Sequence, residues 1–171
     1  MPRLLRAAFF AFVAVCTTSA PIAADELQTP TQTVVLTVSG DIGAVNVDDT
    51  AQFDLEMLMS FDPVTIETTT IWTEGEQIFE GVALQALLER LEVTNGTVLA
   101  TAINNYTVEI PVTDAVVGGP IVAYLLNGDT MSVREKGPLW IVYPYDASAD
   151  YRSEVIYSRS IWQLDRIEIV Q

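Results

Sequence analysis

The side chains that most often carry catalysis are scarce in this chain, and this is the first constraint on its chemistry. The sequence contains no histidine, and its single cysteine, Cys16, lies in an apolar N-terminal stretch. Without histidine, a Ser-His-Asp triad or a Cys-His pair cannot be built. Zinc sites made from histidine or cysteine are excluded beyond residue 16 for the same reason. Residue types and spacing therefore indicate no catalytic residue and no metal ligand.

The remaining candidates for chemistry are weak ones. Carboxylates could hold calcium or magnesium, but no stretch has the alternating acidic spacing of a calcium-binding loop. Asp48 and Asp49 are interpreted as a solvated turn. Residues 118–120, Gly-Gly-Pro, lack the lysine that follows a phosphate-binding loop. Lys136 is the only lysine and could act as a base, but a structural or solvent-facing role is the simpler interpretation.

Charge is spread unevenly along the sequence, which has a formal net charge of −15. Between residues 25 and 133 the only cation is Arg90. The cations that follow are Arg134, Lys136, Arg152, Arg159 and Arg166. They could form an anion-binding site or pair with acidic residues of the same segment, and we favour pairing. The acidic excess argues against nucleic acid or an anionic membrane surface as a partner.

A short apolar strand over residues 139–143 is the element expected to position a site. The run is too short for a buried helix, and Pro144 ends it because proline cannot donate to a sheet ladder. A continuous apolar run of this kind is typical of a strand covered on both faces. Aromatic rings and Asp146 lie at its end, where binding sites tend to form. We expect the rest of the chain to pack around this strand.

Other elements are predicted from periodicity and turn residues. Alternating apolar residues predict strands, a stripe of leucines predicts a helix, and asparagine-containing turns predict hairpins. The predicted strands are residues 33–39, 64–72, 98–103, 106–110, 121–126 and 161–170, and the predicted helix is residues 81–91. Asp54 is predicted to cap a short helix. The pattern indicates an α+β fold in one domain, residues 33–171, with a mixed β-sheet, hairpins and a few short helices.

Residues 1–24 have the pattern of a secretory signal peptide. Arg3 and Arg6 precede an apolar run, and small residues lead to a cleavage site after Ala24. The apolar run is too short to span a bilayer comfortably, which disfavours a membrane anchor. Residues 25–32 are predicted to be a flexible lead-in. We expect a periplasmic or secreted protein with no membrane contact after cleavage.

Cleavage would also change the composition of the mature chain. It would remove the only cysteine, so no disulfide or thiolate–metal bond could form. It would remove Arg3 and Arg6 as well, taking the net charge from −15 to −17. A lipoprotein site at Cys16 is disfavoured, because bulky Val15 precedes it where a small residue is wanted.

Five short motifs follow one another in a recognisable order. They are Phe79-Glu80-Gly81-Val82 before the leucine stripe, Asn104-Asn105-Tyr106, Ala123-Tyr124-Leu125-Leu126-Asn127-Gly128, Gly137-Pro138-Leu139 with Pro144, and residues 161–168. Together they resemble the molybdopterin-binding domain of the sulfite oxidase family over about residues 34–170. The closest likeness is to small exported proteins labelled molybdopterin-dependent oxidoreductases. The resemblance implies a sulfite oxidase molybdopterin-binding-like fold.

The chain departs from this family where the cofactor would be held. The family binds molybdenum through a cysteine before the first motif, whereas residues 67–72 place threonine near that position. A neutral hydroxyl is a poor substitute for a soft thiolate. Lys136, Trp140 and Ile161 stand where the family has histidine, arginine and lysine. We therefore expect no bound cofactor, with molybdopterin implied by resemblance only, and a fold kept for another use.

Three functions stay open, and we favour a non-catalytic exported module that binds a small anionic ligand or a partner protein. The candidate pocket residues are Trp72, Asn104, Tyr106, Arg134, Tyr143, Tyr145, Arg159 and Trp162. Arg159 is the best candidate for an anion contact. For Trp162 and Tyr106, a place in the core is the simpler interpretation. The alternatives are an active molybdopterin-dependent oxidoreductase with unusual ligation, and an acidic accessory or sensor subunit.

Overall fold

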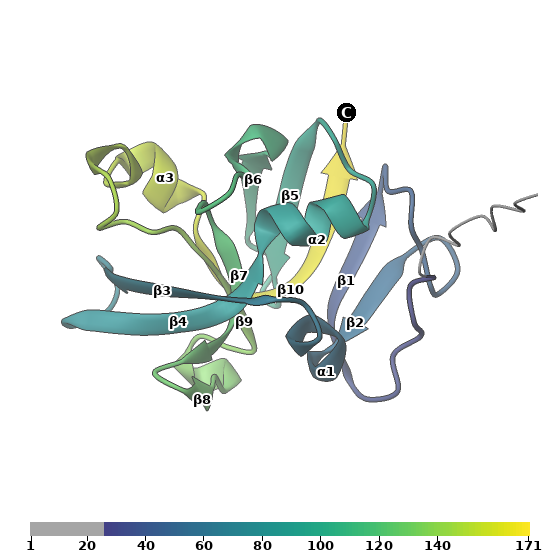
Figure 1. The fold of residues 1–171 in the computed structure, drawn as a ribbon, viewed down its shortest axis with the longest axis horizontal. Helices are drawn as coiled ribbons and strands as arrows, with labels where there is room; N and C mark the ends of the chain where they lie inside the picture. Colours follow the sequence, from purple (N-terminus) through teal and green to yellow (C-terminus); the bar gives the residue numbers. More distant parts are fainter. Residues whose placement is uncertain (1–25) are drawn as a thin grey trace, which may run out of the picture.

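One mixed β-sheet organises the fold in the computed structural model, which describes residues 26–171 (Figure 1). Its strands are β1 (Val34–Gly40), β2 (Ala51–Asp54), β3 (Pro63–Thr69), β4 (Glu76–Ala83), β5 (Thr97–Ala102), β6 (Thr107–Pro111), β7 (Ile121–Leu126), β8 (Asp129–Thr130), β9 (Leu139–Val142) and β10 (Ile161–Val170). The helices are α1 (Leu55–Met59), α2 (Leu84–Arg90) and α3 (Glu154–Ser158), with 3-10 turns η1 (Val112–Asp114), η2 (Val133–Glu135) and η3 (Ala149–Tyr151). The predicted α+β class, with a mixed sheet and short helices, is confirmed.

The predicted central strand is confirmed as β9. The strand path runs β2-β1-β10-β9-β7-β4-β3, so β9 lies at its middle. All four residues of β9 are buried. Ile141 is in register with Ile161 of β10 on one side and with Val122 of β7 on the other. Cover on both faces explains why this strand is apolar throughout.

Strand β10 joins two parts of the sheet and changes partners along its length. Leu164 is in register with Ala102 of β5 and with Leu139 of β9, so these two strands lie on opposite edges of β10. The pairing with β5 covers Leu164 to Val170 only. The pairing with β9 shifts register at Gln163, which has a φ of 55°, and the pairing with β5 shifts register at Asp165. The first residues of β10 therefore have one edge beside which no strand of residues 26–171 lies, and the candidate site is built there.

The predicted helix over residues 81–91 is too long at its N-terminal end. Residues 81–83 belong to β4, and α2 begins at Leu84. At Gly81 an added Cβ would lie 2.2 Å from the backbone oxygen of Val122, so glycine permits a close approach of β4 and β7. Strand pairing therefore outweighs the helical pattern at this point. The leucine stripe itself is buried as expected, from Leu84 to Leu91.

Asp54 caps α1, as predicted, and has a second role. Its carboxylate accepts a hydrogen bond from the backbone N–H of Met57 at 2.9 Å. It also accepts hydrogen bonds from the backbone N–H groups of Thr31 and Gln32, at 2.9 and 3.0 Å. These hydrogen bonds lower the pKa of Asp54, with the bond from Met57 the largest cause. Asp54 therefore fastens Thr31 and Gln32, the last two residues of the predicted lead-in, to the corner between β2 and α1.

The sheet curls around its core, and short helices cover the open sides. Helix α1 packs against both β2 and β4, which lie far apart in the strand path, and α2 packs against β4 and β7 (Figure 1). Helix α3 lies at the other end of the molecule, above the β3–β4 hairpin in this view. Among residues 26–171, no helix is both long and apolar enough to cross a membrane. The predicted signal peptide, residues 1–24, lies outside the described residues.

Candidate functional site

All three tryptophans of the chain meet in one cluster. Trp140 and Trp162 are register partners on β9 and β10, so their side chains lie on the same face of the sheet. The loop after β3 brings Trp72 against both, with ring centroids 6.1 Å from Trp140 and 5.7 Å from Trp162. Trp140 is fully buried, and among the described residues its indole Nε1 has no hydrogen-bond partner. Packing alone thus leaves one donor of the cluster unsatisfied.

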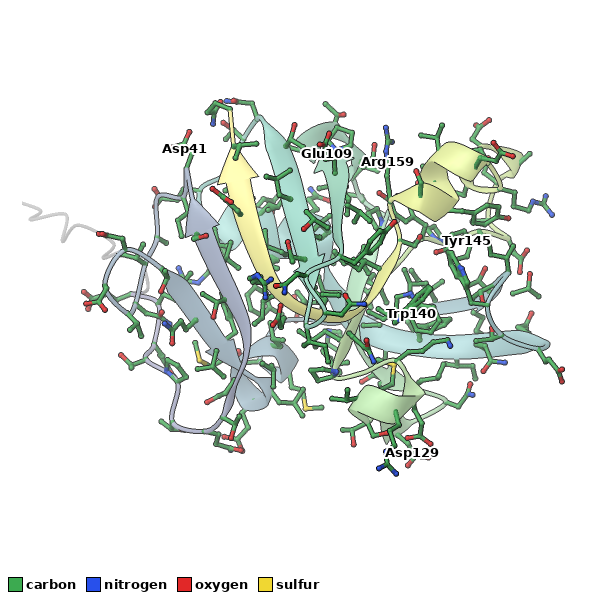
Figure 2. The ribbon with its side chains drawn as sticks, turned by 180° about the vertical axis from the view of Figure 1, so that it is seen from behind. Asp41, Glu109, Asp129, Trp140, Tyr145 and Arg159 are labelled. Atoms are coloured by element: carbon green, nitrogen blue, oxygen red, sulfur yellow. The ribbon has the colours of Figure 1, made fainter. Side chains whose placement is uncertain are left out.

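Two tyrosines extend this cluster toward α3. The ring centroid of Tyr157, on α3, lies 5.9 Å from that of Trp72 and 5.3 Å from that of Tyr145. In Figure 2, Trp140 and Tyr145 lie between α3 and the β3–β4 hairpin. The Tyr145 hydroxyl shares a 2.6 Å hydrogen bond with Ser160, and burial raises the pKa of Tyr145 to about 12. Tyr145 is thus a buried support that stays protonated at neutral pH.

A pocket of about 370 Å³ opens beside this cluster. Its lining residues are Trp72, Ala102, Asn104, Tyr106, Tyr157, Ser160, Ile161, Trp162 and Gln163. It lies where β5 ends at Ala102, so that within the described chain the first residues of β10 have a neighbouring strand, β9, on one edge only. None of the described lining residues carries a formal charge at neutral pH. We call this space the aromatic pocket.

Several polar groups of the aromatic pocket are free to bind something else. Asn104 accepts a hydrogen bond from the backbone N–H of Tyr106 through Oδ1, and Gln163 donates to the carbonyl of Val133 through Nε2. Within the described part of the chain, the Asn104 amide nitrogen, the Gln163 amide oxygen and the Tyr157 hydroxyl have no hydrogen-bond partner. The pocket thus combines ring faces with a few donors and acceptors, as ligand sites do.

Arg159 and Tyr143 share a carboxylate outside the aromatic pocket. Arg159 Nη1 lies 2.8 Å from Asp114 Oδ2, and the hydroxyl of Tyr143 donates to the same oxygen at 2.8 Å. Burial, followed by this hydrogen bond to Asp114, raises the pKa of Tyr143 far above its ordinary value. The group ties η1 to the residue that follows β9 and to the residue that follows α3. The guanidinium predicted to contact an anion is already paired with a carboxylate.

The structure brings together only part of the predicted site. Trp72, Asn104, Tyr106 and Trp162 line the aromatic pocket, and Tyr145 supports it from behind. The other predicted residues, Arg134, Tyr143 and Arg159, do not line it. Arg134 is exposed on η2.

Sequence reasoning missed five lining residues, which are Ala102, Tyr157, Ser160, Ile161 and Gln163. Tyr157 and Ser160 belong to a polar stretch without clear periodicity, and Gln163 interrupts the alternation of the last strand. That interruption is the sequence signal that could have indicated the register shift in β10 at Gln163.

The threonines that the resemblance places near a metal-ligand position form hydrogen bonds within the protein. The hydroxyls of Thr68 and Thr69 donate to the Asp146 carboxylate, and the backbone N–H of Thr69 does so at 2.5 Å. These hydrogen bonds lower the pKa of Asp146. Thr70 accepts from the backbone N–H of Trp72 and so helps to place that ring. Neutral hydroxyls held in this way are poor substitutes for the soft thiolate that the resemblance implies at this position.

No group of three or more His, Cys, Asp or Glu able to hold a metal ion occurs among residues 26–171. No family model matches the chain, and no curated protein matches its sequence. The resemblance to the sulfite oxidase family therefore stays a prediction.

Proposed function

We propose that this protein is a non-catalytic module that binds a small organic ligand in the aromatic pocket. One observation carries the proposal: rings from three separate segments, Trp72, Tyr157 and Trp162, converge on one pocket of about 370 Å³. All three rings are only partly buried, so each keeps surface for a ligand. The unpartnered groups of Asn104, Gln163 and Tyr157 could fix its orientation.

The lining offers little for catalysis. Among its described residues there is no carboxylate, amine, imidazole or thiol, which are the groups that most often act as general acids, bases or nucleophiles. The hydroxyls present are those of Tyr106, Tyr157 and Ser160, and the described lining holds no general base that would activate them. Recognition is therefore the role that these side chains support.

The charge of the lining bears on the class of ligand. The sequence predicts a small anionic ligand or a partner protein, but the described lining contains no cation to meet an anion. Arg159 is paired with Asp114, and the ammonium of Lys136 lies over the rings of Trp140 and Trp162 rather than lining the pocket. The support is thus stronger for a neutral or positively charged ligand.

Intrinsic fluorescence provides a direct test, because every tryptophan of the chain lies in or beside the aromatic pocket. A screen of small neutral, cationic and anionic molecules should find one that changes the emission and saturates. Trp72→Ala should weaken its binding at least ten-fold, because it removes one wall of the pocket.

Phe61→Ala is a matched control, because Phe61 packs on Phe53 near the lead-in and does not line this pocket. Binding should be unchanged in this variant. Equal affinity in wild type and Trp72→Ala would contradict the proposal. Melting temperatures of both variants should be measured alongside, so that loss of folding is not mistaken for loss of binding.

The finer fold assignment and the compartment belong to the same proposal. The order of the five motifs supports a sulfite oxidase-type fold, and the leader pattern of residues 1–24 supports export. Metal analysis of protein exported by a molybdenum-replete host would test the absence of catalysis. About one molybdenum per chain would contradict a non-catalytic module.

A further inference from the structure

The walls of the aromatic pocket meet at steep angles. The ring of Trp72 is inclined by 88° to that of Tyr157 and by 65° to that of Trp162. A flat ligand ring is best sandwiched between parallel walls, whereas walls set at steep angles surround a compact, rounded group on several sides. The three rings therefore meet in a corner and do not form the two parallel walls of a slot.

The electrostatic potential of the aromatic pocket favours a cation. The faces of tryptophan and tyrosine rings are electron-rich and attract positive charge. No described lining residue carries a charge of its own, so a cation meets no repulsion from the lining and an anion finds no counter-ion there. The net charge of −15 also favours the approach of cations over anions.

The protein already places one cation on this cluster. The Lys136 ammonium lies 5.4 Å from the ring centroid of Trp162 and 5.9 Å from that of Trp140, within the range of about 6 Å for a cation–π contact. Lys136 does not line the aromatic pocket. Within the described chain, no cation lies over the rings of Trp72 or Tyr157. The corner that these two rings form is thus the part of the cluster left for a ligand.

From these three observations we propose that the aromatic pocket binds the quaternary ammonium group of a small organic cation, an inference that rests on the proposed function. A fully alkylated nitrogen has no N–H to satisfy, so it loses little by leaving water, and its rounded shape matches a corner of rings. The free groups of Asn104 and Gln163 can then bind a polar tail of the same molecule.

A pair of isosteric probes isolates the contribution of the charge. Choline and 3,3-dimethylbutan-1-ol have the same shape, but the alcohol carries carbon in place of the positive nitrogen. Both should be titrated into the full chain by calorimetry and tryptophan fluorescence. We expect choline to bind at least ten-fold more tightly, which corresponds to about 1.4 kcal/mol. Equal affinities would overturn the inference.

Ring variants locate the binding. Tyr157→Phe keeps the ring and should retain choline binding within about three-fold, whereas Tyr157→Leu removes the ring face and should weaken it about ten-fold. Trp72→Phe should likewise retain more affinity than Trp72→Leu. If the leucine and phenylalanine variants, shown to be folded by their melting curves, bind choline equally well, the assignment to these rings is wrong.

Lys136→Met gives a test with the opposite sign. It removes the positive charge from the back of the cluster but keeps a side chain of similar length. Choline should then bind a few-fold more tightly, while the neutral alcohol should be unaffected, because only the cation senses the lost charge. Weaker choline binding in this variant would contradict a cation site beside Lys136.

The outcomes separate this inference from the proposed function. If both probes bind equally and Trp72→Leu abolishes both, the pocket is a ligand site but not a cation site. If choline does not bind but a neutral or anionic molecule of the screen does, the same conclusion holds. If no molecule of the screen binds in a way that depends on Trp72, the proposed function itself fails.

Discussion

At the scale of single residues, Asp114 decides the role of Arg159. The Asp114 carboxylate forms an ion pair with Arg159 and accepts a hydrogen bond from the Tyr143 hydroxyl, although Arg159 lies 45 positions away in the sequence. Both charged side chains are mostly buried, at 26% and 16% exposure. A pair of this kind belongs to the framework of the protein more than to its ligand.

Arg159→Ala should therefore lower the stability, because it leaves Asp114 beside a buried tyrosine without its cation. We expect a loss of about 1–2 kcal/mol in the free energy of unfolding, measured by urea denaturation. The matched control is Arg134→Ala, since Arg134 is exposed and has no described partner. The double variant Arg159→Ala, Asp114→Asn should lose less free energy of unfolding than the two single variants lose together. Strict additivity of the two losses would disprove the coupling between these residues.

Acid should weaken the fold through Asp54 and Asp146. Their pKa values are lowered from 3.8 in the folded chain, mainly by hydrogen bonds from the backbone N–H groups of Met57 and Thr69. A group with a lowered pKa stabilises the fold fully above its unfolded pKa, and this contribution is lost as pH falls through the folded pKa. The loss should thus begin near pH 3.8, where these carboxyls bind protons in the unfolded chain, and be complete below their lowered pKa values in the folded chain.

Melting curves between pH 7 and pH 2 would show this effect. Asp54→Asn and Asp146→Asn should lower the melting temperature at pH 7, and the difference from wild type should shrink toward pH 2. Asp62→Asn is the control, because Asp62 is exposed and no described partner binds it. A difference that stays constant over the whole range would rule out the two carboxylates as the source.

At the scale of elements, strand pairing sets the boundary between β4 and α2. Leucine periodicity predicts a helix from Gly81, yet Gly81 is in register with Val64 of β3 and Ala123 of β7. Two neighbouring strands thus hold its backbone extended. The pairing with two neighbouring strands outweighs the local helix propensity here, and sequence periodicity does not reveal this pairing.

Gly81→Ala should destabilise the protein strongly, because the new Cβ would lie 2.2 Å from the carbonyl oxygen of Val122. We expect a loss of at least about 1–3 kcal/mol, as in overpacked cores. Gly75→Ala is the comparison: Gly75 has a φ of 70° but nothing within 4 Å, so only backbone strain is added. Urea denaturation of both variants would measure the difference, and a smaller loss for Gly81→Ala would contradict the close approach.

Helix α3 shows the other limit of element prediction. Residues 146–160 are polar and show no clear periodicity, but they contain η3 and the five residues of α3. A helix this short is not stable alone. Ser153 caps it, with its hydroxyl 3.4 Å from the backbone nitrogen of Ile156, and Tyr157 packs it on Trp72. Tertiary packing therefore makes the helix that carries one wall of the pocket.

At the scale of the whole molecule, β10 couples the two parts of the sheet. Leu164 is fully buried and is in register with both β5 and β9. Shortening the Leu164 side chain should destabilise both parts of the sheet together. The aromatic pocket depends on the same junction, since it lies where β10 passes from one set of partners to the other.

Leu164→Ala should cost about 2–5 kcal/mol, as is usual for a buried leucine replaced by alanine. Tryptophan fluorescence reports on the cluster beside β9, whereas far-UV circular dichroism reports on the whole sheet, and the two transitions should still coincide. Val155→Ala is the control, because Val155 is 56% exposed on α3. Separate transitions for the two probes would show that the parts unfold independently.

The sequence by itself determined what depends on neighbouring residues: the apolar run of β9, the hairpin turn at Asn104 and Asn105, the cap at Asp54, and the absence of histidine chemistry. Each follows from local periodicity, turn conformation or residue type.

Only the tertiary structure decided which side chains share a space. Trp72, Tyr157 and Trp162 become neighbours because the strand order and the register shift at Gln163 place them so. Contacts between residues far apart in the sequence also pair Arg159 with Asp114 and place Gly81 in β4. Periodicity reports which face of an element is buried, but the partner across that face is set by packing.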